Sequence, residues 1–389
     1  MTSNLCVLGS TGSVGTRALE VAQRLGIGVC AIAAKKNYQL LEEQARRFRP
    51  KIVSIYDSQA ALRLKNNLKD SFIKVVSGEE GLLEASSRRD SDMVLNAISG
   101  ISGLAPTLEA INAGKNISMA NKESIVAAGE IIRENAKNKG VKILPVDSEH
   151  SAIFQCLEGA KKEKKDVKKI FLTASGGPFW GKSREYLEKA TIKQTLCHPN
   201  WKMGKKITVD SASFMNKGLE LIETTHLFDI APEFIEILVH RQSIIHSMVQ
   251  YRDNSVMAQM SSTDMGLPIQ YAITWPEKFD SCVAELDFAE LRNLSFEKFD
   301  EEIFKLPSIC RNALKLGGTA PAFLVGAGEK AVELFLDSKI SFLPMIDLII
   351  ETFSAYKPCK ILSINDVMAA NSDGQNSSLE IFFKSFARQ

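Results

Sequence analysis

Residues 5–15 read Leu5-Cys6-Val7-Leu8-Gly9-Ser10-Thr11-Gly12-Ser13-Val14-Gly15, and the architecture of the chain follows from them. The four apolar residues predict a buried strand, and Thr16 to Leu25 carry the spacing of a helix. The three glycines between them let the backbone turn tightly, so that free N–H groups at the helix start point toward a bound anion. A glycine-rich turn between a strand and a helix indicates a dinucleotide site.

The alternation of strand and helix continues to about residue 146. Further strands are predicted at Val29–Ala33, Ile52–Tyr56, Met93–Ala97, Asn116–Met119 and Val141–Val146. Strands that alternate with helices form a parallel sheet with right-handed crossovers, and the loops at one edge bind ligands. The pattern predicts an α/β, Rossmann-like dinucleotide-binding domain over residues 1–150.

Beyond residue 150 the alternation stops. A lysine-rich stretch, 161–169, is expected to form a solvated loop. A mixed pattern then predicts an α+β catalytic domain over 151–284, with strands at Lys169–Thr173, Ile235–Val239 and Ser255–Met260 and a helix near Lys217–Phe228. An acidic linker is expected over 285–305. Helical spacing predicts a C-terminal helical bundle over 306–389, with helices at Ser308–Leu316, Pro321–Asp337, Phe342–Tyr356 and Ile364–Phe386.

Composition excludes several classes of protein. The 389 residues are 45% hydrophobic and 24% charged, which is typical of a folded globular chain. A net charge of +2 provides no broad basic field for nucleic acid, and no apolar stretch reaches the roughly 20 residues of a membrane span. The start, 1–8, leaves no room for a targeting segment, and seven scattered cysteines favour a reducing compartment. A cytoplasmic protein with a small-molecule partner is expected.

The second predicted strand ends before Lys35, Lys36 and Asn37. An NAD enzyme places an acidic residue here, whereas a lysine favours the 2′-phosphate of NADPH. The alternative is that both lysines are merely solvated.

Two acidic residues follow the last strand of the first domain. Asp147 and Glu149 are two apart, so in extended chain they face one side and converge on one point. Such a pair usually requires a cation, and hard oxygen ligands suit Mg²⁺ or Mn²⁺. The alternative is ordinary surface acidity.

A second polar cluster surrounds the start of the helix near residue 217. If that helix begins near Asn216, Glu220 shares a face with both Asn216 and Lys217. Ser211, Asn216 and Lys217 are suitable phosphate donors, and Glu220 would complete the metal shell. Earlier in the chain, the glycines after Ser175 allow close backbone approach to an anion.

The loop from Cys197 to Gly204 carries His198 and Trp201 among Pro, Asn and Gly. An exposed tryptophan loop predicts a lid over the substrate, with His198 as a phosphate donor. The alternative is that Trp201 belongs to the core.

Six motifs together resemble the 1-deoxy-D-xylulose 5-phosphate reductoisomerase family, in order along nearly the whole chain. They are GSTGSVG (9–15), ANKES (120–124), VDSEHSA (146–152), SGGPF (175–179), HPNWKMG (198–204) and VDSASFMNKGLE (209–220). The resemblance implies a homodimer that uses NADPH to convert 1-deoxy-D-xylulose 5-phosphate to 2-C-methyl-D-erythritol 4-phosphate, in isoprenoid precursor synthesis.

The resemblance also implies roles for individual residues. Asp147, Glu149 and Glu220 would hold Mg²⁺ or Mn²⁺, with Co²⁺ as a further candidate ion. The implied catalytic residues are Lys122, Glu149 and His198. The implied cofactor-binding residues are Gly9, Thr11, Gly12, Ser13, Val14, Lys36, Asn37, Asn121, Glu123 and Gly204. The implied substrate-binding residues are Lys122, Ser148, Glu149, Ser175, His198, Trp201, Ser211, Asn216, Lys217 and Glu220, with the phosphate on Ser175, Ser211, Asn216 and Lys217.

Three segments depart from the family pattern. Lys35 stands where some members carry glycine, Arg241 replaces a proline, and 325–329 replaces Asn-Ala-Ala-Asn-Glu. The first is expected to alter cofactor affinity, and the other two to affect the dimer or the bundle rather than the reaction. Two alternative functions stay open. One is an NADP-dependent semialdehyde or sugar dehydrogenase without a metal, and the other is a non-catalytic NADPH sensor.

Overall fold

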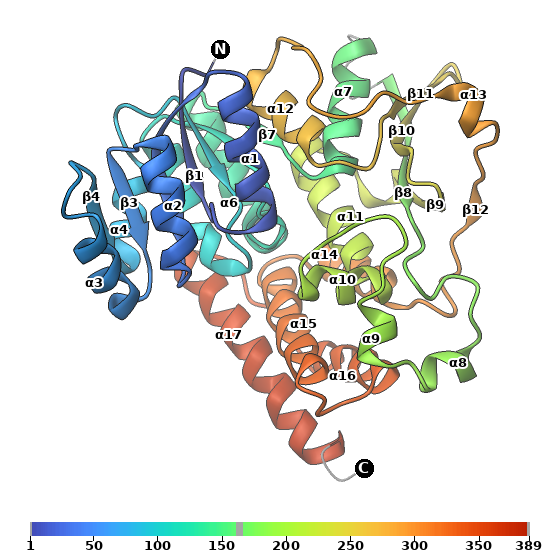
Figure 1. The fold of residues 1–389 in the computed structure, drawn as a ribbon. Helices are drawn as coiled ribbons and strands as arrows, with labels where there is room; N and C mark the ends of the chain where they lie inside the picture. The colour runs from blue at the N-terminus through green and yellow to red at the C-terminus, as the bar shows by residue number, and fades with distance from the viewer. Residues whose placement is uncertain (1, 161–165, 387–389) are drawn as a thin grey trace. The chain divides into compact units, whose positions relative to one another are not determined.

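The computed structural model describes residues 2–160 and 166–386. They form two compact units, each built from segments that are separate in the chain (Figure 1). The first unit runs to residue 124 and adds 130–151 and 264–285, and the second contains 125–129, 152–263 and the chain from 286 onward. Residues 161–165 of the expected lysine-rich loop lie outside the described residues. The domain boundaries at 150, 284 and 305 stay predictions.

The first unit contains a seven-stranded sheet in the order β4-β3-β2-β1-β5-β6-β7. Its strands are β1 (Asn4–Leu8), β2 (Gly28–Ala34), β3 (Ile52–Ile55), β4 (Lys74–Ser77), β5 (Met93–Asn96), β6 (Asn116–Met119) and β7 (Ile143–Pro145). Every pairing is parallel, and the strand order reverses beside β1, where such sheets bind ligands. The six predicted strands and the Rossmann-like fold are confirmed, whereas β4 was not predicted.

Helices pack on this sheet, which explains why its central strands are apolar throughout. The helices that contribute residues to the first unit are α1 (Ser13–Arg24), α2 (Tyr38–Phe48), α3 (Ser58–Asn67), α4 (Gly78–Ser86), the 3-10 turn η1 (Ile101–Gly103), α5 (Leu104–Asn112), α6 (Lys122–Lys139), α7 (Ser148–Ala160) and α12 (Gly266–Thr274). Figure 1 shows α1 and α2 next to the strands, where α1 packs against β1 and α2 packs against β2. Leu5 to Leu8 are 0% exposed, because a parallel strand is covered on both faces.

The second unit contains a five-stranded sheet in the order β11-β10-β8-β9-β12. Its strands are β8 (Val167–Ala174), β9 (Ile235–Val239), β10 (Ile245–Tyr251), β11 (Val256–Met260) and β12 (Glu297–Lys298). Only the β8–β9 pairing is parallel among these described strands. The strands predicted near 169, 235 and 255 are confirmed, but β10 was missed. The expected linker 285–305 contains β12, which extends the sheet beside β9.

Residues 152–160 of α7 belong to the second unit, and so do the remaining helices. They are α8 (Arg184–Glu188), α9 (Ile192–Thr195), α10 (Lys205–Ala212), α11 (Met215–Phe228), the 3-10 turn η3 (Pro232–Phe234), α13 (Phe288–Leu291), α14 (Leu306–Leu316), α15 (Ala320–Leu336), α16 (Phe342–Ser354), α17 (Ile364–Ile381) and a π-helical turn (Phe382–Phe386). The last four α-helices confirm the predicted C-terminal helical bundle.

The family departure at 325–329 lies in α15, at its contact with α17. A Cβ atom added to Gly326 would lie 1.9 Å from the Asn371 carbonyl oxygen, and one added to Gly374 would lie 2.2 Å from that of Phe323. The two helix backbones therefore touch, and glycine is required on both sides. As expected, this departure concerns the bundle.

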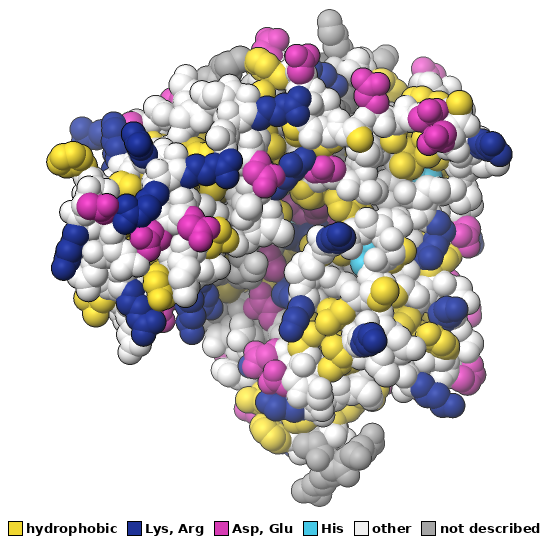
Figure 2. Space-filling view, in the orientation of Figure 1, with side chains coloured by type: hydrophobic (Ala, Val, Ile, Leu, Met, Phe, Trp, Pro, Cys, Tyr) yellow, Lys and Arg dark blue, Asp and Glu magenta, His cyan; other side chains and the backbone are white. Residues whose placement is uncertain are grey.

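The surface shows no large area of one charge in the view of Figure 2, where basic and acidic side chains are interspersed. Among the described residues, every helix is too short or too polar to cross a membrane.

Candidate active site

The glycine-rich turn joins β1 to α1 and has the shape of an anion cradle. Gly9 has φ +81°, and a Cβ atom added there would lie 2.4 Å from the Ala97 carbonyl oxygen. A Cβ atom on Gly15 would lie 2.2 Å from the Gly9 carbonyl oxygen, so both positions require glycine. Gly12, the N-cap of α1, makes no side-chain hydrogen bond to the N–H groups of the first turn. Such a turn fits the pyrophosphate of a dinucleotide.

Gln44 on α2 holds this turn from behind, and local sequence offered no signal for it. The Ser10 hydroxyl donates to Gln44 Oε1 at 2.8 Å, and Gln44 Nε2 donates to the Ser10 carbonyl oxygen at 2.8 Å. Both residues are buried. The turn is therefore positioned by a residue 34 places away in the chain.

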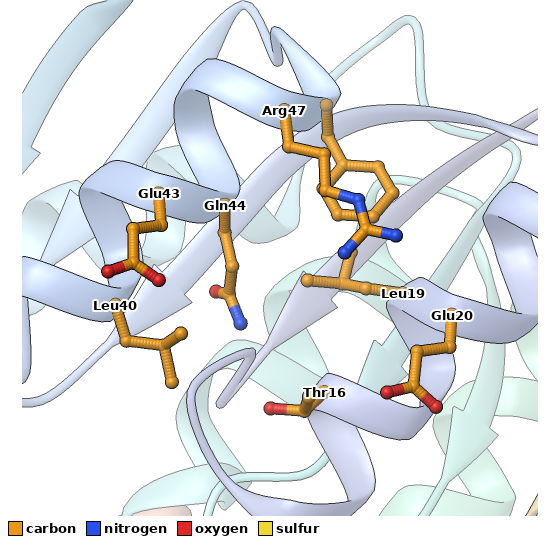
Figure 3. Close-up of a pocket in the computed structure, with 8 residues that line it drawn as sticks. Thr16, Leu19, Glu20, Leu40, Glu43, Gln44 and Arg47 are labelled. Carbon is orange, nitrogen blue, oxygen red and sulfur yellow. The ribbon is translucent and has the colours of Figure 1, made fainter.

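A hollow between α1 and α2 lies beside this anchor (Figure 3). Figure 3 shows that α1 and α2 both line it, and its lining residues are Thr16, Leu19, Glu20, Leu40, Glu43, Gln44, Arg47 and Phe48. Its charged side chains are the carboxylates Glu20 and Glu43 and the guanidinium of Arg47, so the hollow carries charges of both signs. Charge alone therefore does not single out a phosphate as its ligand.

The predicted 2′-phosphate residues follow β2 at the correct sheet edge. Lys35, Lys36 and Asn37 are all exposed. Asn37 is the N-cap of α2, and its Oδ1 accepts from the Leu40 N–H at 3.2 Å. Lys36 is accessible to a phosphate, whereas Asn37 already has a structural role as a cap.

Asn121 is fully engaged within the first unit. Its Nδ2 donates to the carbonyl oxygens of Ile98 and Gly100, at 2.5 and 2.8 Å, and its Oδ1 caps α6 by accepting from the Ser124 N–H at 3.0 Å. Asn121 and Glu123 are both buried. The cofactor roles of Asn121 and Glu123 stay predictions, and the visible function of Asn121 is to join the loops after β5 and β6.

The two acidic residues after β7 converge, but the reason given from sequence was wrong. Helix α7 begins at Ser148, so Glu149 lies in its first helical turn rather than in extended chain. The turn of the helix still leaves one carboxylate oxygen of Asp147 within 4.8 Å of one of Glu149. The Ser148 hydroxyl donates to Glu149 at 2.6 Å.

Lys122, at the start of α6, donates from Nζ to Asp147 Oδ2. Burial raises the pKa of Asp147, but the nearby Lys122 ammonium and His150 outweigh it and hold the pKa well below its usual range. Asp147 is therefore ionised at neutral pH. An ionised carboxylate with a second one within 4.8 Å is a donor set that suits a hard divalent cation.

In the second unit, the turn after β8 has the backbone of an anion site. Gly176 and Gly177 have φ +84° and +61°, and the Gly177 N–H donates to the Ser175 hydroxyl at 3.2 Å. His198 Nε2 lies 2.9 Å from the same hydroxyl. Because His198 Nδ1 accepts the N–H groups of Asn200 and Trp201, at 3.2 and 2.9 Å, Nε2 carries the ring proton. His198 thus presents a donor at the turn, as a phosphate ligand requires.

Helices α10 and α11 supply the other predicted phosphate groups. The chain turns between them at Phe214, with φ +59°, so α11 begins at Met215, close to the predicted start. Asn216 Nδ2 and Lys217 Nζ both donate to Glu220, which confirms the shared helix face. Lys217 also donates to the Thr173 carbonyl oxygen at 2.5 Å.

Ser211 lies next to the glycine turn. A Cβ atom on Gly177 would lie 3.1 Å from the Ser211 carbonyl oxygen. The bond from Lys217 to Thr173 ties α11 to the end of β8, just before Ser175. The structure therefore gathers Ser175, His198, Ser211 and Lys217 around the end of one strand.

The predicted lid is a loop, and Trp201 is partly exposed. The Trp201 ring lies 6.1 Å from the His246 ring. Asn200 Nδ2 donates to the Arg241 carbonyl oxygen at 2.6 Å and to the Ser243 hydroxyl at 2.8 Å. Gly204 ends the loop as the N-cap of α10. The core alternative for Trp201 does not fit, whereas loop closure stays a prediction.

The structure places Arg241 elsewhere than its departure from the family pattern suggested. Its departure from the family pattern was expected to matter for the dimer or the bundle. In the structure its guanidinium Nη1 donates to the carbonyl oxygens of Ser175 and Gly177, each at 3.0 Å. Arg241 thus contacts the predicted phosphate turn itself.

Comparisons with known proteins match this chain along most of its length. Family models described as 1-deoxy-D-xylulose 5-phosphate reductoisomerase and its C-terminal domains match residues 5–129, 143–228 and 260–376. The reductoisomerase of Acetivibrio thermocellus is 50% identical over 95% of this chain and 96% of its own, and that of Chloroherpeton thalassium is 49% identical over 94% of each.

Solved structures of reductoisomerases have the same fold as this chain. The Zymomonas mobilis reductoisomerase in complex with NADPH superposes with a TM-score of 0.91 at 39% identity, over 98% of this chain and 99% of that one. A reductoisomerase in complex with NADPH, fosmidomycin and magnesium gives 0.91 at 35% identity, over 98% and 99%. This agreement along almost the full length shows that the chain belongs to the 1-deoxy-D-xylulose 5-phosphate reductoisomerase family.

Proposed function

We propose that this protein converts 1-deoxy-D-xylulose 5-phosphate to 2-C-methyl-D-erythritol 4-phosphate, with NADPH and a divalent metal ion, in isoprenoid precursor synthesis. The observation that carries the proposal is 50% identity over 95% of the chain to a relative named for this reaction. The seven cysteines form no disulfide, which fits a cytoplasmic enzyme.

We further propose that Asp147, Glu149 and Glu220 hold Mg²⁺ or Mn²⁺, with Co²⁺ as another candidate. Asp147 is ionised, its carboxylate lies within 4.8 Å of that of Glu149, and all three side chains offer hard oxygen ligands. A related reductoisomerase was solved with magnesium. When bound, the ion would polarise the ketone and hydroxyl oxygens of the substrate.

Residues of this chain then position the reacting groups. Lys122 places an ammonium beside Asp147, where it can contact an oxygen of the substrate and hold positive charge near it. The Ser148 hydroxyl, which donates a hydrogen bond to Glu149 in the structure, would contact the same end of the substrate. The glycine turn would hold the pyrophosphate of NADPH, and the cofactor would supply the hydride that reduces the aldehyde formed by rearrangement.

The substrate phosphate is proposed to bind Ser175, Ser211, Asn216, Lys217 and the Nε2–H of His198. These groups include one ammonium and several neutral donors, which together suit a phosphate. The Trp201 loop would close over the substrate and exclude water from the aldehyde.

The deciding experiment is to measure NADPH oxidation by purified protein with 1-deoxy-D-xylulose 5-phosphate and Mg²⁺. Turnover that disappears with a chelator and returns with Mg²⁺ supports the proposal. Metal-independent turnover would indicate a semialdehyde or sugar dehydrogenase. NADPH binding without turnover would indicate a sensor.

Lys36→Ala is expected to weaken NADPH binding about tenfold and leave the weaker NADH binding unchanged, because only NADPH carries a 2′-phosphate. Calorimetric titration with both cofactors measures this effect. Lys65→Ala is the matched control, since Lys65 is an exposed lysine of the same unit on α3. Equal affinity of the native protein for both cofactors would contradict the argument.

Addition of fosmidomycin is expected to change tryptophan emission, because the loop encloses Trp201 when it closes. The change should disappear in Trp201→Phe. Trp180 and Trp275 serve as internal controls, and Trp180 is held by a 2.9 Å bond from its Nε1 to Glu297. An unchanged response in Trp201→Phe would show that another tryptophan reports and would remove support for the lid.

We also propose a homodimer that includes β11, an edge strand of the second sheet with Val256 47% and Met257 38% exposed. Unpaired edge strands tend to associate. Val256→Lys is expected to weaken dimerisation about tenfold or more, by placing a charge at the contact. Sedimentation across a dilution series measures it, with Phe72→Lys, on a fully exposed residue of the first unit, as control. Unaltered association of Val256→Lys would exclude β11 from the contact.

A further inference from the structure

Arg241 reaches the predicted phosphate turn because of strand register. β8 and β9 are parallel, and Ala174 pairs with Val239 at their carboxyl ends. The pairing continues one step further, since the His240 N–H donates to the Ala174 carbonyl oxygen at 2.8 Å. Ser175 follows β8 directly and Arg241 follows β9 after His240, so the two residues meet at one edge of the sheet.

The guanidinium of Arg241 holds two carbonyl groups of the turn. Nη1 lies 3.0 Å from the oxygens of Ser175 and Gly177, and a Cβ atom on Gly176 would lie 2.7 Å from this nitrogen. In a trans peptide the N–H points away from the C=O, so holding the Ser175 carbonyl turns the Gly176 N–H to the opposite side. The carbonyl oxygens of Ser175 and Gly177 therefore point away from the side that the Gly176 N–H faces. The permanently charged guanidinium of Arg241 lies on the carbonyl side of the turn.

The backbone of Arg241 also contacts the loop that carries Trp201. Asn200 donates to its carbonyl oxygen at 2.6 Å and to the Ser243 hydroxyl at 2.8 Å. Trp201 follows Asn200 in the loop, and its N–H donates to His198 Nδ1. One residue thus contacts the turn through its side chain and the loop through its main chain.

We propose that Arg241 is a positioning residue for the substrate phosphate. It orients the Ser175–Gly177 turn so that the Gly176 N–H faces the phosphate, and it sets the loop carrying His198 against the same turn. This inference rests on the proposed function, because it assumes that the turn binds the phosphate of the substrate. Arg241 acts on substrate binding, because its guanidinium contacts the carbonyl side of the turn and the Gly176 N–H faces the opposite side.

Steady-state kinetics of Arg241→Met separate this role from a general structural one. The KM for 1-deoxy-D-xylulose 5-phosphate is expected to rise between about 10- and 100-fold, the range for losing bonds from a charged donor, while the KM for NADPH and kcat change little. Inhibition by inorganic phosphate should weaken by the same factor. Arg241→Lys, which keeps the charge but not the planar fork, should give intermediate values.

Arg184→Met is the matched control, because Arg184 is an exposed arginine of the same unit on α8. A KM for the substrate in Arg241→Met equal to that of Arg184→Met would overturn the proposal, as would a loss confined to kcat. If Arg241→Met does not fold, Arg241→Lys carries the same test, and native KM and phosphate inhibition in it would also overturn the proposal.

The result is distinguishable from failure of the proposed function. If the native protein does not oxidise NADPH with this substrate, calorimetric titration with inorganic phosphate still compares native protein with Arg241→Met. Weaker phosphate binding by the variant supports Arg241 as the organiser of the turn, and equal binding overturns it.

Discussion

Glu149→Gln is expected to lower turnover about 1,000-fold while the fold and NADPH binding stay intact. Glutamine keeps the shape of the side chain but removes the charge that the proposed cation needs. Losing metal-assisted charge stabilisation costs several kcal/mol, and each 1.36 kcal/mol is about tenfold in rate. NADPH binding should persist, because the glycine turn lies at β1, in other elements of the first unit.

The measurement is kcat with saturating substrate and metal, together with NADPH affinity. Glu158→Gln is the matched control, since Glu158 is an exposed carboxylate on the same helix, α7. Partial recovery with excess Mn²⁺ would show a defect in metal affinity, and no recovery would show a defect in geometry. Near-native turnover of Glu149→Gln would mean that Glu149 is not a ligand.

Gly15→Ala is expected to reduce NADPH affinity about 100-fold. The added methyl carbon would lie 2.2 Å from the Gly9 carbonyl oxygen and 2.6 Å from Ser10 Cα. Both are backbone atoms of the turn, so the turn must open. Overpacking of this kind costs about 1–3 kcal/mol of stability, and the opened backbone no longer fits a pyrophosphate.

Calorimetric titration with NADPH and thermal unfolding measure the two effects. Gly12→Ala is the control for the fold, because its methyl carbon would lie 3.3 Å from the Gly9 oxygen, so it should lower stability less. Native NADPH affinity in a folded Gly15→Ala protein would show that the cofactor binds elsewhere.

Strands were predictable where the apolar run was long or was bounded by a clear turn. β1 and β2 were found because covering helices require continuous apolar residues. β4 was missed because its residues, Lys74 to Ser77, are only partly buried at a sheet edge. β10 was missed even though it is an interior strand of the second sheet, paired with β8 and β11.

The polar residues were also predictable to different degrees. The helix spacing of Asn216, Lys217 and Glu220 follows from 3.6 residues per turn, and the structure confirms their contacts. Convergence of Asp147 and Glu149 was predicted from the wrong backbone conformation. The contact between Arg241 and Ser175 was not predicted, because it spans 66 residues.

Local sequence patterns were enough to predict the α/β first domain, the glycine turn and the C-terminal helices. These depend on neighbouring residues, whose hydrophobic period and backbone freedom are properties of the local chain. Three contacts became visible only in the folded chain: Gln44 anchors the turn at Ser10, α12 packs beside α1 in the first unit, and Arg241 supports Ser175. Each of these depends on which strands and helices become neighbours, and strand register between distant segments is set by packing of the whole sheet rather than by any local pattern.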